Sequence, residues 1–269
     1  MKRYFKIYKI LLRNSIIREM NFAANFWLWL ICEALWFFAQ IALIEVIFLH
    51  TKEVAGWNKW QVVMLFGAHH MTSQFFQAFF FMNLTNLPEL IRTGKLDFIL
   101  LQPMNAQFAV SVQKFGFDNL INGFVGLVFV AYACMKLGFV PSLLQIVLFF
   151  AGILLAMCIH YGMMMLLSSI SFWIIKAQGL VYGYYTLMNI ARYPDAVFGV
   201  APRLMQFAMS IIIPVMVVSN VPVRLFNDIT TGPNLSLSIL FFIGGCVWMM
   251  GASALFWRFA LRHYTSASS

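Results

Sequence analysis

Between two long apolar stretches, the chain reads Leu87-Pro-Glu-Leu-Ile-Arg-Thr-Gly-Lys-Leu-Asp-Phe-Ile-Leu-Leu-Gln-Pro-Met104. This segment is short and is bracketed by Pro88 and Pro103. Its charges alternate in sign, whereas its apolar residues recur at roughly helical spacing, with Gly94 as a break. The pattern predicts an amphipathic docking element outside the membrane. The alternative is an interfacial helix that only turns the chain around.

The composition is that of a membrane protein. Hydrophobic residues make up 62% of the chain and charged residues only 10%, with a mean hydropathy of +0.83, whereas soluble domains are about 25% charged. We therefore expect a multi-span, all-α integral membrane protein. The net charge of +9 indicates contact with anionic lipid at the cytoplasmic surface, and we expect no nucleic-acid partner. The four cysteines lie in apolar runs without a metal-binding spacing, so we expect no metal site.

The first 21 residues are basic and have apolar residues at helical spacing, which predicts an amphipathic helix on the cytoplasmic leaflet. We therefore divide the chain into this helix, residues 1–21, and a transmembrane domain, residues 22–269. The basic residues of the helix that would face anionic lipid are Lys2, Arg3, Lys6, Lys9, Arg13 and Arg18.

Five apolar stretches are long enough to cross a bilayer, which takes about 20 helical residues. They are residues 22–49, 60–82, a stretch that ends near 135, 143–175 and 235–261. If both termini lie inside, the region 177–231 must cross an odd number of times. Two pieces of it compete for the remaining span, namely 177–191 and 204–221. The total is then about six spans.

Three groups of residues, in this order, carry a resemblance to a known family. They are Ile91-Arg92-Thr93-Gly94-Lys95-Leu96-Asp97 with Leu100, Leu101 and Pro103; Arg192-Tyr193-Pro194 with Ile213-Pro214; and the tail Arg262-His263-Tyr264-Thr265-Ser266-Ala267-Ser268-Ser269. Over its whole length the chain resembles the permease subunits of ABC-2 type exporters, in a six-span subfamily.

The resemblance implies a bacterial inner-membrane subunit with both termini cytoplasmic. It would work as a dimer with an identical or similar second permease, and two separate ATPase subunits would bind ATP and Mg. The chain itself would bind no cofactor and would not be an enzyme. Its coupling helix would consist of Pro88, Glu89, Leu90, Ile91, Arg92, Gly94, Lys95, Leu96 and Asp97. Leu90, Ile91 and Leu96 would fill a groove on the ATPase.

The resemblance favours 177–191 as the fifth span and 204–221 as a re-entrant hairpin on the outer side. Twelve of the 18 lysines and arginines would then be cytoplasmic, which agrees with the positive-inside rule. The outer ones would be Lys52, Lys59, Lys136, Arg192, Arg203 and Arg224. The other assignment moves Arg192 and Arg203 inside, so charge alone favours 204–221. We follow the resemblance.

Polar residues inside two spans are candidates for lining the translocation path. An ionised carboxylate in the bilayer costs at least about 2.5 kcal/mol, so its presence there indicates a function. One stripe, on the first span, is Trp29, Glu33, Trp36 and Gln40. The second, on the next span, is His70, Gln74 and Gln77, with His69 beside it. Hydrogen bonding between helices explains both stripes equally well.

Two other functions compete with the ATP-driven exporter. The first is an ion- or proton-coupled secondary carrier that uses Glu33, His69 and His70 as a relay. The second is a membrane-embedded enzyme that acts on lipid, for which the chain offers no nucleophile or metal constellation.

Overall fold

A computed structural model describes residues 2–20, 23–174, 178–227 and 234–265. The longer helices are α1 (Lys2–Met20), α2 (Ala23–His50), α3 (Lys59–Phe76), α8 (Phe117–Leu137), α9 (Leu143–Ser169), α10 (Gln178–Met188), α12 (Val215–Phe226) and α13 (Leu235–Arg262). Within the described ranges the only strands are the short antiparallel pair β1 (Glu53–Val54) and β2 (Trp57–Asn58). The predicted all-α membrane class is confirmed.

Shorter helical elements connect the long ones. They are η1 (Gln77–Phe81), α4 (Met82–Leu84), α5 (Leu87–Arg92), α6 (Lys95–Leu100), α7 (Ala106–Ser111), η2 (Ile170–Phe172), η3 (Asn189–Arg192), η4 (Asp195–Val200), α11 (Arg203–Phe207) and η5 (Ala208–Ile212). Asn58 and Ser142 form capping boxes that start α3 and α9, since each side chain binds a backbone N–H that the first helical turn leaves unpaired.

Four helices are long and apolar enough to cross a membrane: α2 from Trp27 onward, α8, α9 continued to Phe172, and α13. A fifth candidate is α11–η5 together with α12, which bend by 79° at a short break. In the part of the chain that the structure describes, this criterion selects neither α3 nor α10. The six-span count therefore stays a prediction, and so does the choice of the fifth span.

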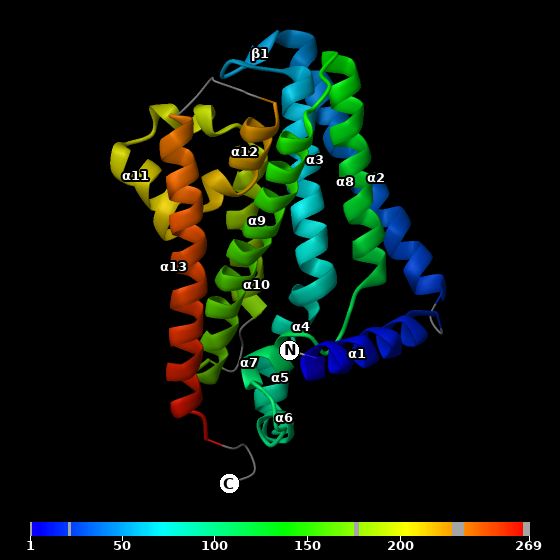
Figure 1. Ribbon diagram of the computed structural model, residues 1–269, viewed down its shortest axis with the longest axis vertical. Helices are drawn as coiled ribbons and strands as arrows, with labels where there is room; N and C mark the ends of the chain where they lie inside the picture. Colours follow the sequence, from blue (N-terminus) through cyan, green and yellow to red (C-terminus); the bar gives the residue numbers. More distant parts are fainter. Residues whose placement is uncertain (1, 21–22, 175–177, 228–233, 266–269) are drawn as a thin grey trace.

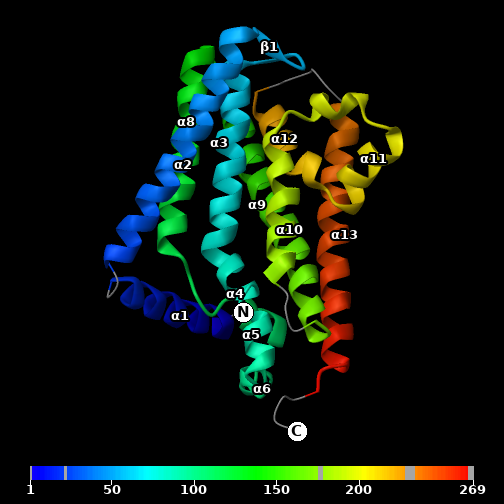
Figure 2. The same ribbon diagram turned by 180° about the vertical axis from the view of Figure 1, so that it is seen from behind.

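Helices α1, α5 and α6 and the C-terminal end of α13 lie at one end of the helical bundle, and the β1 turn lies at the other end (Figure 1). Helix α1 runs across the ends of the long helices (Figures 1 and 2). Ser15 anchors it, because the Ser15 Oγ accepts a hydrogen bond of 3.2 Å from the Phe115 N–H. The side chains of Lys6, Lys9 and Arg13 are exposed. Those of Lys2, Arg3 and Arg18 lie outside the described side chains, as does the predicted domain boundary at 21–22.

Glycine allows α3 and α8 to pack closely. A Cβ placed on Gly126 would lie 2.6 Å from the Gly67 carbonyl oxygen, and one on Gly67 would lie 2.8 Å from the Gly126 carbonyl oxygen. Between helices in lipid, where burial of apolar surface gives little driving force, such small residues supply the packing contact.

We expect Gly126→Ala to destabilise the protein by about 1–3 kcal/mol, because the added methyl group meets backbone atoms that cannot rotate away. The measurement is the midpoint of thermal unfolding in detergent. The matched control is Gly244→Ala in α13, where an added Cβ meets nothing within 4 Å. Equal midpoints for the two variants would contradict the prediction.

Candidate translocation cavity and coupling surface

A cavity of about 310 Å³ lies between α2, α3 and α10. Helix α2 packs on α3 through aromatic contacts, since the ring centres of Phe37 and His70 are 4.4 Å apart. The residues that line the cavity are Glu33, Trp36, Phe66, His69, His70, Ser73, Gln74, Gln77, Tyr184, Tyr185, Met188 and Asn189.

Glu33 is tied to the facing helix by a hydrogen bond. Its Oε2 accepts from the Gln74 Nε2 at 3.0 Å. The other polar atom of that amide, Gln74 Oε1, is buried without a hydrogen-bond partner. A buried acceptor that is left unpaired is costly.

Most of the predicted polar residues meet in this cavity. Glu33 and Trp36 come from α2, and His70, Gln74 and Gln77 come from α3 together with the start of η1, accompanied by His69. Trp29 is exposed and is not among the lining residues. Gln40 lies elsewhere, where its Oε1 accepts a hydrogen bond of 3.3 Å from the Arg192 Nη1.

Helix α10 supplies a wall of the cavity that was not predicted from the sequence. Tyr185 donates from its hydroxyl to the Gln77 Oε1 at 3.4 Å, and the Tyr184 hydroxyl is hydrogen-bonded to the His160 Nδ1. The tyrosines of residues 182–185 are evident in the sequence, but no spacing rule predicts that a segment so far along the chain packs against α3. Among the described residues, no group of three potential ligands can hold a metal ion.

The predicted coupling segment forms two short helices, α5 and α6, that meet at Gly94. Gly94 has a φ of +67°, a left-handed conformation that favours glycine. Pro88 lies in the first turn of α5, where no backbone donor is lost. Arg92 donates to both carboxylate oxygens of Glu89, at 2.7 and 2.9 Å. This exposed pair lowers the pKa of Glu89 below its usual value.

Most of the apolar side of the segment faces the chain's own core. Leu90 and Leu96 are buried in the core, and Ile91 packs against the same cluster. That these three side chains fill a groove on an ATPase stays a prediction. The burial of Leu90 and Leu96 within the chain argues against it for those two, whereas Ile91 is only partly buried. The most exposed apolar side chains of this segment are Phe98, 72% exposed, and Leu101, 81% exposed, and Leu100 is 36% exposed.

The residues that follow α13 contact the coupling segment. The Tyr264 hydroxyl is buried and faces the Asp97 carboxylate; burial, reinforced by Asp97, raises the pKa of Tyr264 to about 12. The Tyr264 ring lies 5.7 Å from that of Phe172. Asp97 is thus engaged within the protein, whereas Lys95 on the same helix is exposed.

A family model described as "ABC-2 family transporter protein" matches residues 34–268. The chain belongs to this family. The match begins inside α2 and covers the coupling segment and every residue that lines the cavity except Glu33. No curated protein and no solved structure gave a match. This ABC-2 permease is a multi-pass membrane subunit of an ABC exporter, and permeases of the family typically work with ABC ATPase partners.

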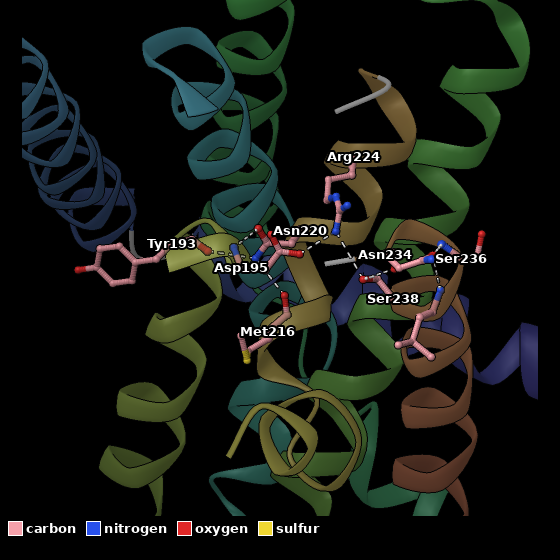
Figure 3. Close-up of polar contacts among 9 residues, drawn as sticks. Tyr193, Asp195, Met216, Asn220, Arg224, Asn234, Ser236 and Ser238 are labelled. Carbon is pink, nitrogen blue, oxygen red and sulfur yellow. Dashed lines mark hydrogen bonds and ion pairs between the residues drawn. The ribbon is translucent and has the colours of Figure 1, made fainter. Parts of the chain in front are cut away.

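A buried ion pair joins three elements of the ABC-2 permease, η4, α12 and the start of α13 (Figure 3). The Arg224 Nη1 of α12 lies 3.0 Å from the Asp195 Oδ2 of η4, and it reaches the Ser238 Oγ of α13 at 3.5 Å. The Asn220 Oδ1 accepts from the Asp195 N–H at 2.9 Å, and the Asn220 Nδ2 donates to the Tyr193 carbonyl at 3.1 Å. From the sequence, Arg224 was predicted only to be one of the basic residues on the outer side, and no acidic partner was assigned to it.

Proposed function

We propose that this permease is half of a dimeric bacterial inner-membrane exporter, paired with an identical or similar second permease and driven by two ATPase subunits that bind ATP and Mg. The cavity between α2, α3 and α10 forms part of the translocation path. The end that carries α1, α5, α6 and both termini is cytoplasmic. The observation that carries the proposal is the pair of exposed apolar side chains, Phe98 and Leu101, on a segment whose other face is anchored in the permease.

The anchoring supports a mechanical role for α5 and α6. Leu90 and Leu96 lie in the same apolar cluster as residues of α9 and α13. Because protein cores are close-packed and resist compression, a push on α6 is transmitted to those helices. Glu89, Arg92 and Lys95 are exposed around the contact, where charges set the orientation of a partner.

The exposure of α2 supports a dimer. Only 11% of its most apolar window is buried within one chain. Trp29 and Trp36 are exposed on α2, and Tyr182 is exposed on α10, the helix that forms the opposite wall of the cavity. A second permease placed over these helices would shield Glu33 from lipid, where an ionisable side chain is unfavourable.

The bent pair supports the re-entrant assignment of 204–221. Helices α11 and α12 both lie in the half of the bundle nearest β1, whereas α10 runs beside α9 in the other half (Figures 1 and 2). Residues 178–191 would then form the fifth span, which η3 extends; residue 177 lies outside the described residues. Backbone that leaves helical geometry at membrane depth is tolerated where protein covers it.

The test is gentle purification of the tagged permease from its native host, followed by mass spectrometry and an ATPase assay. We expect to recover an ABC ATPase subunit, with ATP hydrolysis in the eluate. The same experiment identifies a second permease if the dimer is mixed. Recovery of the permease alone, without ATP hydrolysis in several mild detergents, would reject this function in favour of a gradient-driven carrier that uses Glu33, His69 and His70.

A further inference from the structure

The cavity between α2, α3 and α10 carries a negative charge. It contains the Glu33 carboxylate, and the other polar side chains that line it are uncharged amides, hydroxyls and imidazoles. Asp118, at the start of α8, also interacts electrostatically with Glu33. Among the described residues that line the cavity there is no lysine or arginine. The cavity therefore favours a ligand that carries positive charge and donates hydrogen bonds.

One cation lies close to the cavity along the chain, and its side chain is engaged. Arg192 follows the lining residue Asn189 by three positions. Its Nη1 donates to the Gln40 Oε1 at 3.3 Å, and its Nη2 donates to the Tyr193 hydroxyl at 3.1 Å. The histidines of the cavity have their own contacts too, since the His69 Nδ1 lies 3.2 Å from the Ser219 Oγ. In the described structure, Glu33 has no cationic partner of its own among these groups.

Aromatic rings supply the rest of the lining. Trp36 and Phe66 stand on one side, with ring centres 6.4 Å apart, and Tyr184 and Tyr185 come from α10. The faces of Trp, Tyr and Phe attract cations through their quadrupoles, and the effect grows when water is excluded. A carboxylate beside aromatic rings is thus a suitable setting for an organic cation.

We propose that this cavity binds a small hydrophobic amine in its protonated form, and that such amines are the class of compound exported. The ammonium group donates to Glu33, and the apolar body packs on the aromatic rings. The volume of about 310 Å³ is at the lower end for ligand sites and limits the ligand to roughly one fused ring system. The binding site rests on the cavity alone, whereas the role of the amine as exported substrate rests on the proposed function.

The experiment is equilibrium dialysis of the full-length permease in lipid nanodiscs at pH 7, with empty nanodiscs subtracted for partition into lipid. The probes are 1-naphthylmethylammonium and the neutral 1-naphthalenemethanol, which share a ring and differ in charge. We expect saturable binding of the ammonium and about tenfold weaker binding of the alcohol, since hydrogen bonds to a charged group contribute about 1.5–3 kcal/mol.

Glu33→Gln should weaken binding of the ammonium by about tenfold or more and leave binding of the alcohol unchanged. The matched control is Glu45→Gln. Glu45 is on the same helix as Glu33, but its carboxylate pairs with Lys59 and does not line the cavity. Trp36→Leu, which removes a ring and no charge, should weaken binding of the ammonium more than binding of the alcohol. Size-exclusion profiles identify any variant that fails to fold.

Equal affinity of the unmodified permease for the two probes would overturn the proposal, whatever the variants do. Equal effects of Glu33→Gln and Glu45→Gln would overturn it as well. The hydrogen bond between Glu33 and Gln74 would then serve only to hold α2 against α3. Dialysis requires no ATPase. Failure to recover an ATPase therefore rejects the exporter and leaves the amine site standing, and loss of selective binding does the reverse.

Discussion

Arg224→Ala is expected to lower the stability of the permease by about 3–5 kcal/mol, because it leaves the Asp195 carboxylate buried without its counter-charge. Arg224 is fully buried, and its ion pair with Asp195 joins η4 to α12. The same guanidinium reaches Ser238 at the start of α13. One substitution therefore loosens three elements at the end of the bundle opposite the coupling segment.

The measurement is the fraction of protein that remains monodisperse after heating, followed by size exclusion. Arg203→Ala is the matched control, since it removes a neighbouring arginine whose side chain is exposed; we expect its midpoint to stay close to that of the unmodified protein. The double variant Asp195→Leu with Arg224→Met removes both charges and should recover much of the loss, since apolar replacement of a whole buried pair is often neutral. If Arg224→Ala and Arg203→Ala unfold at the same temperature, the ion pair does not stabilise η4, α12 and α13.

The second large effect concerns the contact with the ATPase. We expect Phe98→Ala and Leu101→Ala each to weaken the association by roughly thirtyfold or more, because apolar anchors near the centre of an interface commonly contribute about 2 kcal/mol or more. Neither side chain packs on the permease core, so the permease itself should keep its unfolding temperature. Co-purified ATPase per permease, measured over a range of detergent washes, gives the result.

Leu143→Ala is the matched control for Leu101→Ala. Leu143 is 78% exposed at the start of α9, at the other end of the bundle, and its truncation should leave ATPase recovery unchanged. Leu96→Ala should behave in the opposite way to the surface variants, since Leu96 is buried: it should lose about 2–5 kcal/mol of stability. Normal ATPase recovery with Phe98 and Leu101 both truncated would show that α6 is not the docking surface.

The coupling segment illustrates how far sequence periodicity reaches. Its charges, its two prolines and Gly94 predicted one short amphipathic element outside the spans with a break at Gly94, and the structure has two short helices there, α5 and α6. Periodicity identifies an apolar face but not the surface that covers it. Leu90 and Leu96 were therefore assigned to a partner, although both are buried within the chain, where η2 and α9 pack against α5 and α7 packs against α6. The exposed Phe98 and Leu101 were overlooked.

The polar stripes show the same limit. Intervals of three and four placed Glu33 with Trp36, and His70 with Gln74, on single helix faces, and both faces meet in the cavity. Tyr184 and Tyr185 could not be added, because contacts between helices distant in sequence depend on how the whole bundle packs. The partner of Arg224 was hidden for the same reason, since Asp195 lies 29 residues away on another element.

The sequence by itself determined the membrane class, the amphipathic character of the first helix, the positions of the long apolar helices and the break at Gly94. These properties follow from local composition and from the 3.6-residue period of a helix, which act within one or two turns. Tertiary structure alone decided which side of the coupling segment is free, which tyrosines complete the cavity and which carboxylate neutralises Arg224. The reason is physical: burial and pairing are properties of surfaces brought together by folding, and a single chain segment carries only one of the two surfaces.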